Sequence, residues 1–147
     1  MDIGDWKKEL EPALAAALLR GHATIGSSPV ERLDIGVFPW HGTMELSFLL
    51  SEDVADDVCE PNDVAAWPLY NVSNFSEGKW PEAKMLFQYM QETWEQDTRS
   101  SESFFYAVAA VAGYASVADI IRQFTHSAGF AVTLYDPDRR GSSNYCA

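Results

Sequence analysis

The chain has 147 residues, of which 22 are acidic and 10 are basic, so its formal net charge at pH 7 is −12. This length fits one domain, residues 1–147, and a composition that is 47% hydrophobic and 13% aromatic excludes a disordered chain. The negative charge argues against direct binding to nucleic acid or to a membrane surface, and it favours a partner with a basic surface.

Residues 5–20 are the first predicted helix, because an apolar residue recurs there at every fourth position. Asp5 is expected to cap the start of this helix and Gly21 to end it. Pro12 lies inside the range, where it removes one backbone hydrogen bond. We expect it to kink the helix or to move its start to about Glu11.

Residues 33–40 and 43–50 are two predicted strands, with a tight turn at His41-Gly42 between them. Apolar and polar residues alternate in the second strand, so one of its faces is expected to be buried. Together the two strands predict an antiparallel hairpin.

The remaining elements follow from periodicity and from breaking residues. They are a loop or short helix at 51–66, a short edge strand at 67–72, a helix at 80–96, a helical region at 102–125 broken at Gly113, and a final strand at 129–135. This order predicts an α+β domain: an antiparallel sheet of three to five strands with helices packed mainly on one face.

Two features of the sequence suggest a cytoplasmic address. No stretch approaches the ~18 uninterrupted apolar residues of a membrane span, and the first residues lack the basic and apolar regions of a secretory signal. Cys59 and Cys146 lie far apart without metal-ligand spacing. We expect two free thiols, with a disulfide between them left open as the alternative.

The sequence contains none of the common catalytic motifs: no Gly-rich phosphate loop, no nucleophile elbow, and no paired His or Cys motif for a metal. We therefore expect no enzymatic activity, no cofactor and no metal. The alternative is a small hydrolase or transferase in which His41 and Glu45, close to the predicted turn, meet as general base and orienting carboxylate.

Negative charge concentrates between Arg32 and Lys79, an interval that contains no other Lys or Arg. Its acidic residues are Asp34, Glu45, Glu52, Asp53, Asp56, Asp57, Glu60, Asp63 and Glu77. Most of them fall within 52–63, which predicts an electronegative docking face. The alternative is a solvated loop that keeps the protein in solution. The carboxylates predicted to bind a partner are Asp53, Asp56, Asp57, Glu60 and Asp63.

Aromatic residues surround this acidic interval. Trp40, Trp67 and Trp80 each lie beside a proline, and Tyr70 follows Trp67 closely. Rigid, partly exposed aromatic rings are typical of interface hot spots, so we predict that these four residues contribute to partner binding. The alternative is that they fill the edges of the core under long loops.

Several segments together resemble a known family. They are Gly36-Val37-Phe38 before the strand 44–50, then Trp67-Pro68-Leu69-Tyr70, the helix 80–94, the helical region 104–124 and the closing strand 130–136. In element order and aromatic placement they resemble a bacterial domain family of unknown function, whose members often occur beside polymorphic or secreted toxins as candidate immunity proteins. The resemblance implies a cytoplasmic bacterial protein that neutralises a toxin by tight binding, and it transfers no catalytic residue.

The leading hypothesis from the sequence is therefore an immunity-type inhibitor, monomeric or homodimeric, that binds a basic bacterial toxin or effector protein. Opposite charges would accelerate the encounter, and buried aromatic contacts would then hold the complex together. The alternatives are an acidic mimic of nucleic acid that blocks a DNA-binding protein or nuclease, and the hydrolase described above.

Overall fold

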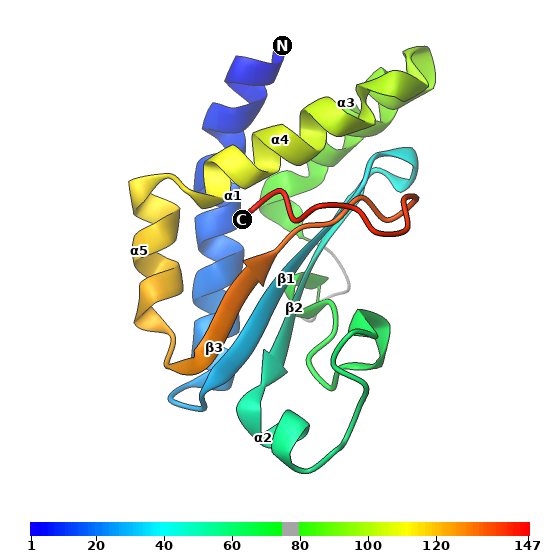
Figure 1. The fold of residues 1–147 in the computed structure, drawn as a ribbon. Helices are drawn as coiled ribbons and strands as arrows, with labels where there is room; N and C mark the ends of the chain where they lie inside the picture. Colours follow the sequence, from blue (N-terminus) through cyan, green and yellow to red (C-terminus); the bar gives the residue numbers. More distant parts are fainter. Residues whose placement is uncertain (75–79) are drawn as a thin grey trace.

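The computed structural model describes residues 1–74 and 80–147. Glu77 and Lys79 lie outside the described residues. In chain order the helices and strands are α1 (Ile3–Ile25), β1 (Val30–Phe38), β2 (Thr43–Leu50), α2 (Ser51–Ala55), α3 (Lys84–Gln96), α4 (Ser101–Ala112), α5 (Ala115–Gln123) and β3 (His126–Thr133) (Figure 1). The predicted α+β class is confirmed, as is the break at Gly113, which separates α4 from α5.

The sheet has the strand order β2-β1-β3. β1 and β2 form the predicted antiparallel hairpin, although β1 already ends at Phe38 and a 3-10 turn (Pro39–His41) precedes Gly42. β3 pairs with β1 in parallel, so the expectation of a purely antiparallel sheet is wrong. Helices α1 and α5 lie side by side and end at the same end of the sheet (Figure 1). Because β1 follows α1 and β3 follows α5, both strands start at that end and run in the same direction. The Val30 N–H donates to the Thr125 carbonyl at 2.8 Å, which aligns the starts of the two strands.

The helices cover one face of the sheet, here called the inner face. Its strand residues and the apolar stripe of α1 belong to one buried cluster. Gly21 of α1 lies directly on β2, because a Cβ added there would be 3.1 Å from a ring atom of Phe48. On β1 and β2 the inner-face residues are Leu33, Ile35, Val37, Met44, Leu46 and Phe48.

Helix α1 extends beyond the predicted range 5–20 at both ends. Asp2, not Asp5, caps its start, because the Asp2 carboxylate accepts a hydrogen bond from the Asp5 N–H at 2.8 Å. The helix ends at Gly26, whose φ of 64° is a left-handed value that favours glycine. Pro12 lies within one continuous helix, so the helix does not start near that residue.

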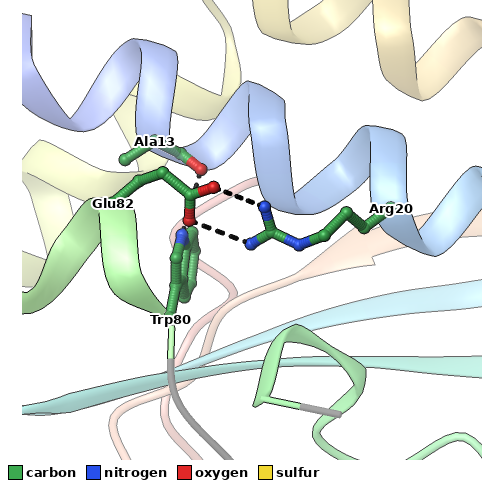
Figure 2. A network of polar contacts seen from close by, with 4 residues as sticks. All are labelled: Ala13, Arg20, Trp80 and Glu82. Atoms are coloured by element: carbon green, nitrogen blue, oxygen red, sulfur yellow. Dashed lines mark hydrogen bonds and ion pairs between the residues drawn. The ribbon is translucent and has the colours of Figure 1, made fainter. Parts of the chain in front are cut away.

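A 3-10 turn (Pro81–Ala83) before α3 is attached to α1 by two contacts (Figure 2). Trp80 is 2% exposed, and its Nε1 donates to the Ala13 carbonyl at 3.1 Å. Arg20 and Glu82 form a two-pronged ion pair at 2.6 and 3.1 Å. The prediction that Trp80 is partly exposed is wrong, because the large apolar ring is buried against α1 with its N–H satisfied.

The opposite face of the sheet, here called the outer face, is covered in part by the segment that follows α2. The predicted edge strand at 67–72 does not form, since only an isolated bridge joins Leu69 to Phe48. The chain turns at Asn71, where φ is 52°, and this ends the extended run. Leu49 is completely buried beneath the segment, so the outer face is packed at this end.

One side chain closes part of the free edge of β3. The Asn144 amide donates to the Val132 carbonyl and accepts from the Leu134 N–H, both at 2.9 Å. The Tyr145 N–H then donates to the Leu134 carbonyl at 2.9 Å. These bonds occupy backbone groups that a further strand would otherwise use.

Candidate functional site

The acidic segment runs from α2 to a 3-10 turn (Val64–Ala66), with Cys59 in its middle. The pKa of the Cys59 thiol is raised, first by desolvation and then by the surrounding negative charges. Asp56 lies at the end of α2 and is exposed. The carboxylates that act on Cys59 are Asp53, Asp63, Glu60 and Asp57. We call residues 51–66 the acidic loop.

No ion pair compensates these charges in the part of the chain that the structure describes. The ion pairs found there are Arg20–Glu82, Arg99–Asp97 and Arg122–Asp119, all outside the acidic loop. Arg32, the last cation before the loop in the sequence, donates from its guanidinium to the Pro61 carbonyl at 3.2 Å and lies 5.9 Å from the centre of the Trp67 ring. Arg32 therefore contacts the loop through a backbone carbonyl and forms no ion pair with a loop carboxylate.

Asp53 is the most enclosed carboxylate of the loop. Its side chain is half-buried, and its Oδ2 atom is buried without a hydrogen-bond partner among the described residues. No group of three or more His, Cys, Asp or Glu side chains within residues 1–74 and 80–147 is arranged to hold a metal ion. Cys59 and Cys146 are both free thiols in the structure.

The predicted aromatic residues divide into two kinds. Trp67 is 2% exposed and donates from Nε1 to the Pro61 carbonyl at 3.2 Å, so the prediction that it is partly exposed is wrong. Like Trp80, it is buried and contributes to packing rather than to the exposed surface. Trp40 is half-buried and packs edge-to-face on Phe38, with ring centres 6.0 Å apart. Trp40 therefore retains an accessible edge, and its role in partner binding stays a prediction.

Tyr70 is half-buried and holds a carboxylate of β2. Its hydroxyl donates to Glu45 at 2.6 Å, and this bond, together with burial and the Glu45 charge, raises the pKa of Tyr70 to about 12. The hydroxyl consequently stays protonated at neutral pH and fixes the position of the carboxylate. Tyr70 therefore belongs to the surface next to the acidic loop.

A pocket that the sequence analysis did not predict lies on the outer face, beside the acidic loop. Its volume is about 370 Å³, within the usual range of ligand pockets. The outer-face residues Asp34, Gly36, Phe38, Glu45 and Ser47 line it, with Val64, Ala65, Tyr70, Tyr135 and Pro137 from the flanking loops. We call it the outer-face pocket.

Asp34 is a half-buried carboxylate that β1 contributes to this pocket. Burial raises its pKa, and the Glu45 charge adds to the increase, whereas the hydrogen bond from Thr133 and the charge of Arg32 lower it. The Thr133 hydroxyl donates to Asp34 Oδ1 at 2.6 Å. Neither Asp34 nor Glu45 forms an ion pair within the described part of the chain. The pocket therefore holds two carboxylates oriented by neutral donors.

The proposed hydrolase pair is not assembled. Glu45 accepts its hydrogen bond from Tyr70, while His41 is exposed in the turn beside Trp40, with ring centres 6.1 Å apart. His22 and His126 each place Nε2 within 3.2 Å and 2.8 Å, respectively, of a backbone carbonyl near the end of α5. The histidines thus provide no catalytic arrangement among the residues described.

The signal that could have revealed the pocket is present in the sequence. Counting back from the predicted turn at His41-Gly42 pairs Phe38 with Glu45, whereas the observed register pairs Gly36 with Glu45 and Asp34 with Ser47. The two registers differ by two residues, so each strand keeps the same side chains on the same face. Because side chains alternate along a strand, both carboxylates must then share one face of the hairpin. The contributions of Tyr135 and Pro137 come from a distant loop and have no such local signal.

Comparisons with protein-family models, with curated proteins and with solved structures found no match to this chain. No individual helix in the described part of the chain is long and apolar enough to cross a membrane; taken together, the bent pair Thr98–Ala112 and Ala115–Gln123 passes on length and composition alone.

Proposed function

We propose that this chain is an immunity-type inhibitor that binds and neutralises a basic bacterial toxin or effector protein through its acidic loop. The observation that supports the proposal best is that four loop carboxylates all raise the pKa of the Cys59 thiol, while none of them forms an ion pair among the described residues. Charges that stabilise a fold are usually paired with opposite charges, whereas a surface that meets a cationic partner leaves them free.

The loop is also ordered enough to present its charges in a fixed arrangement. The Val58 N–H donates to the Asp53 carbonyl at 3.0 Å, and the Asp63 N–H donates to the Glu60 carbonyl at 3.0 Å. A preorganised loop loses little conformational entropy on binding, so more of the electrostatic attraction contributes to affinity. Such attraction acts over roughly 10 Å at 0.1 M salt and weakens as salt rises.

The first test is affinity capture with a loop variant in which Asp53, Asp56, Asp57 and Glu60 are changed to Asn or Gln. Wild-type and variant protein are immobilised, exposed at low salt to a lysate of the organism that encodes the chain, and eluted with a salt gradient. We expect the wild type to retain one basic protein, identified by mass spectrometry, and the variant to release it at clearly lower salt.

A matched control separates the location of the charges from their number. Changing four exposed acidic residues outside the loop to Gln alters the net charge by the same amount; these are Glu9, Glu92, Glu95 and Glu102. This control variant is expected to bind as the wild type does. Equal weakening in both variants, or unchanged binding of the loop variant at low and high salt, would contradict the proposed docking loop.

Neutralisation is tested with the captured partner. Cells that express the partner alone are expected to lose viability, and co-expression of this chain to restore it. Addition of double-stranded DNA to the purified complex tests the nucleic-acid mimic, since DNA displaces the chain only if both occupy one site. Failure of the wild-type chain to protect the cells would contradict the inhibitor function.

A further inference from the structure

The outer-face pocket presents its two carboxylates at diagonal positions on neighbouring strands. Asp34 is paired with Ser47 and Glu45 with Gly36, so the carboxylates are offset by two residues along the hairpin. Diagonal neighbours on a sheet lie roughly 7–8 Å apart. Each is oriented by a neutral hydroxyl, Asp34 by Thr133 and Glu45 by Tyr70. A cationic ligand with several donors could therefore bind both.

Aromatic rings and small residues shape the same space. Phe38 lies over Gly36, where an added Cβ would be only 2.8 Å from a Phe38 ring atom. The glycine thus allows the ring to lie across the floor of the pocket. Tyr70 and Tyr135 stand on opposite flanks, on loops after β2 and β3. Aromatic faces attract cations, and planar cations can also stack on them.

The spacing of the carboxylates and the aromatic lining favour one kind of cation over others. A compact metal ion needs several oxygen ligands converging at about 2.0–2.6 Å, and no such group exists in the described residues. A lysine ammonium is a point charge that keeps its water strongly, whereas a guanidinium is planar, weakly hydrated and rich in donors. The combination of two spaced carboxylates with aromatic walls fits the guanidinium.

We propose that the outer-face pocket receives the guanidinium group of an arginine side chain on the basic protein partner. The inference rests on the function proposed above and deepens it by naming what the partner inserts. Asp34 and Glu45 accept hydrogen bonds from the guanidinium, and the rings of Phe38, Tyr70 and Tyr135 border it. The site provides a short-range anchor, whereas the acidic loop provides long-range attraction.

The pocket and the acidic loop form one continuous surface. Asp63 of the loop directly precedes Val64, and Val64 and Ala65 line the pocket. A basic partner drawn to the loop is therefore already at the rim of the pocket. This continuity allows one arginine to bind while neighbouring cations remain over the loop.

Titration of the protein with L-arginine amide, followed by two-dimensional amide NMR, tests the pocket without needing the partner. We expect saturable shifts of Gly36, Phe38 and Tyr70 with a dissociation constant on the order of 1–10 mM, as suits a ligand of this size. Citrulline amide, which has a similar shape without the charge, is expected to produce no saturable shift. Similar shifts from both compounds, or shifts located elsewhere, would overturn the proposal.

Variants of the two carboxylates test whether arginine amide binds in the outer-face pocket. The double variant D34N/E45Q is expected to weaken arginine amide at least about tenfold, because both charge-assisted bonds are lost. E9Q, which removes an exposed charge on α1, is expected to leave affinity unchanged. If the double variant does not give a folded spectrum, E45Q alone is used. Tighter saturation by spermidine than by arginine amide would assign the pocket to a small-molecule ligand and overturn the proposal.

Association and dissociation rates of the complex with the captured partner distinguish the role of the pocket from that of the acidic loop. The loop variant is expected mainly to slow association, and D34N/E45Q is expected to speed dissociation by about 30-fold or more, as for a buried charge pair. Unchanged dissociation of the pocket variant would overturn the arginine site and leave the acidic loop untouched. Unchanged binding of the loop variant would instead contradict the proposed docking function.

Discussion

The two faces of the sheet are built from the same strands but have different compositions. On the inner face, Ile35 and Leu46 are fully packed against helices and belong to the main core. Their sequence neighbours Asp34 and Glu45 point to the opposite face and line a pocket. The comparison teaches that alternation along a strand allows adjacent residues to serve stability and recognition separately.

Inner-face residues and Asp34 of the outer face contribute to stability with opposite signs. Burial of one large apolar side chain contributes about 1.5–3 kcal/mol to stability, so the inner face favours the folded state at each position. On the outer face, burial raises the pKa of Asp34, which means that its charged form is disfavoured in the folded protein at neutral pH. A residue retained against stability in a pocket is a candidate for function.

The largest expected difference in the free energy of unfolding is between substitutions at Leu46 and at its neighbour Glu45. Leu46→Ala is expected to lower the free energy of unfolding by about 2–5 kcal/mol, because it leaves a cavity in the core. Glu45→Gln is expected to change it by less than about 1 kcal/mol, since the Tyr70 hydroxyl can still donate. Urea unfolding followed by circular dichroism measures both. Equal losses would remove the distinction between the faces.

The tryptophans give a second comparison. Trp80→Phe is expected to destabilise the protein by about 1–3 kcal/mol, because it removes a buried hydrogen bond to Ala13 and leaves space against α1. Trp40→Phe is the matched control, since Trp40 is half-buried and packs on Phe38 at the outer face. It is expected to cost less than about 1 kcal/mol. A larger loss of stability for Trp40→Phe than for Trp80→Phe would contradict the conclusion that Trp80, and not Trp40, is the core residue.

Asp34→Asn is expected to raise stability at pH 7. Because the folded pKa of Asp34 is raised, its destabilising charge is absent below the unfolded pKa of about 3.9 and fully present above the folded pKa. The gain from Asn should therefore disappear as pH falls through this window. Thermal unfolding between pH 3 and pH 7 measures the effect. A loss of stability at pH 7 would show that the Thr133 bond to the charged form outweighs burial.

The smallest effect is expected at the half-exposed pair between Arg20 and Glu82. The hydrogen bond from Arg20 lowers the pKa of Glu82, so its contribution is present above the unfolded pKa and lost as pH falls through the folded pKa. Solvent screens the pair, and Glu82→Gln is expected to cost at most about 1 kcal/mol at pH 7. Urea unfolding at low and high salt checks this. A cost that persists at pH 2 would have a cause other than the ion pair.

Local pattern predicted the hairpin and the helices well. The alternation in 43–50 and the spacing in 80–96 left a direct trace in the sequence. In β2 the expected single buried face holds only for its first half, because residues 46–50 are all buried. The acidic loop was predicted from charge alone. Its ordering around Cys59 depends on turns at Asp57 and beyond that composition does not encode.

Some errors are local, such as the cap of α1 and the burial of Trp67 against Pro61, but several concern contacts between distant segments. Trp80 lies beside Pro81, which suggested a loop position, but its ring is buried against Ala13, 67 residues earlier in the chain. The parallel pairing of β3 depends on where α5 ends relative to α1, and helical periodicity says nothing about that position. The pocket was missed because five of its twelve lining residues come from loops after β2 and β3.

Asn144 has a consequence for how the protein behaves at high concentration. Its amide group imitates the backbone of one more strand beside Val132 and Leu134. Replacing it with alanine would uncover the Val132 carbonyl on β3 and the Leu134 N–H just past its end. The eight-residue strand contains neither proline nor an acidic or basic residue other than His126. Such an edge favours self-association by strand addition, so the Asn144 amide helps to prevent polymerisation along this edge.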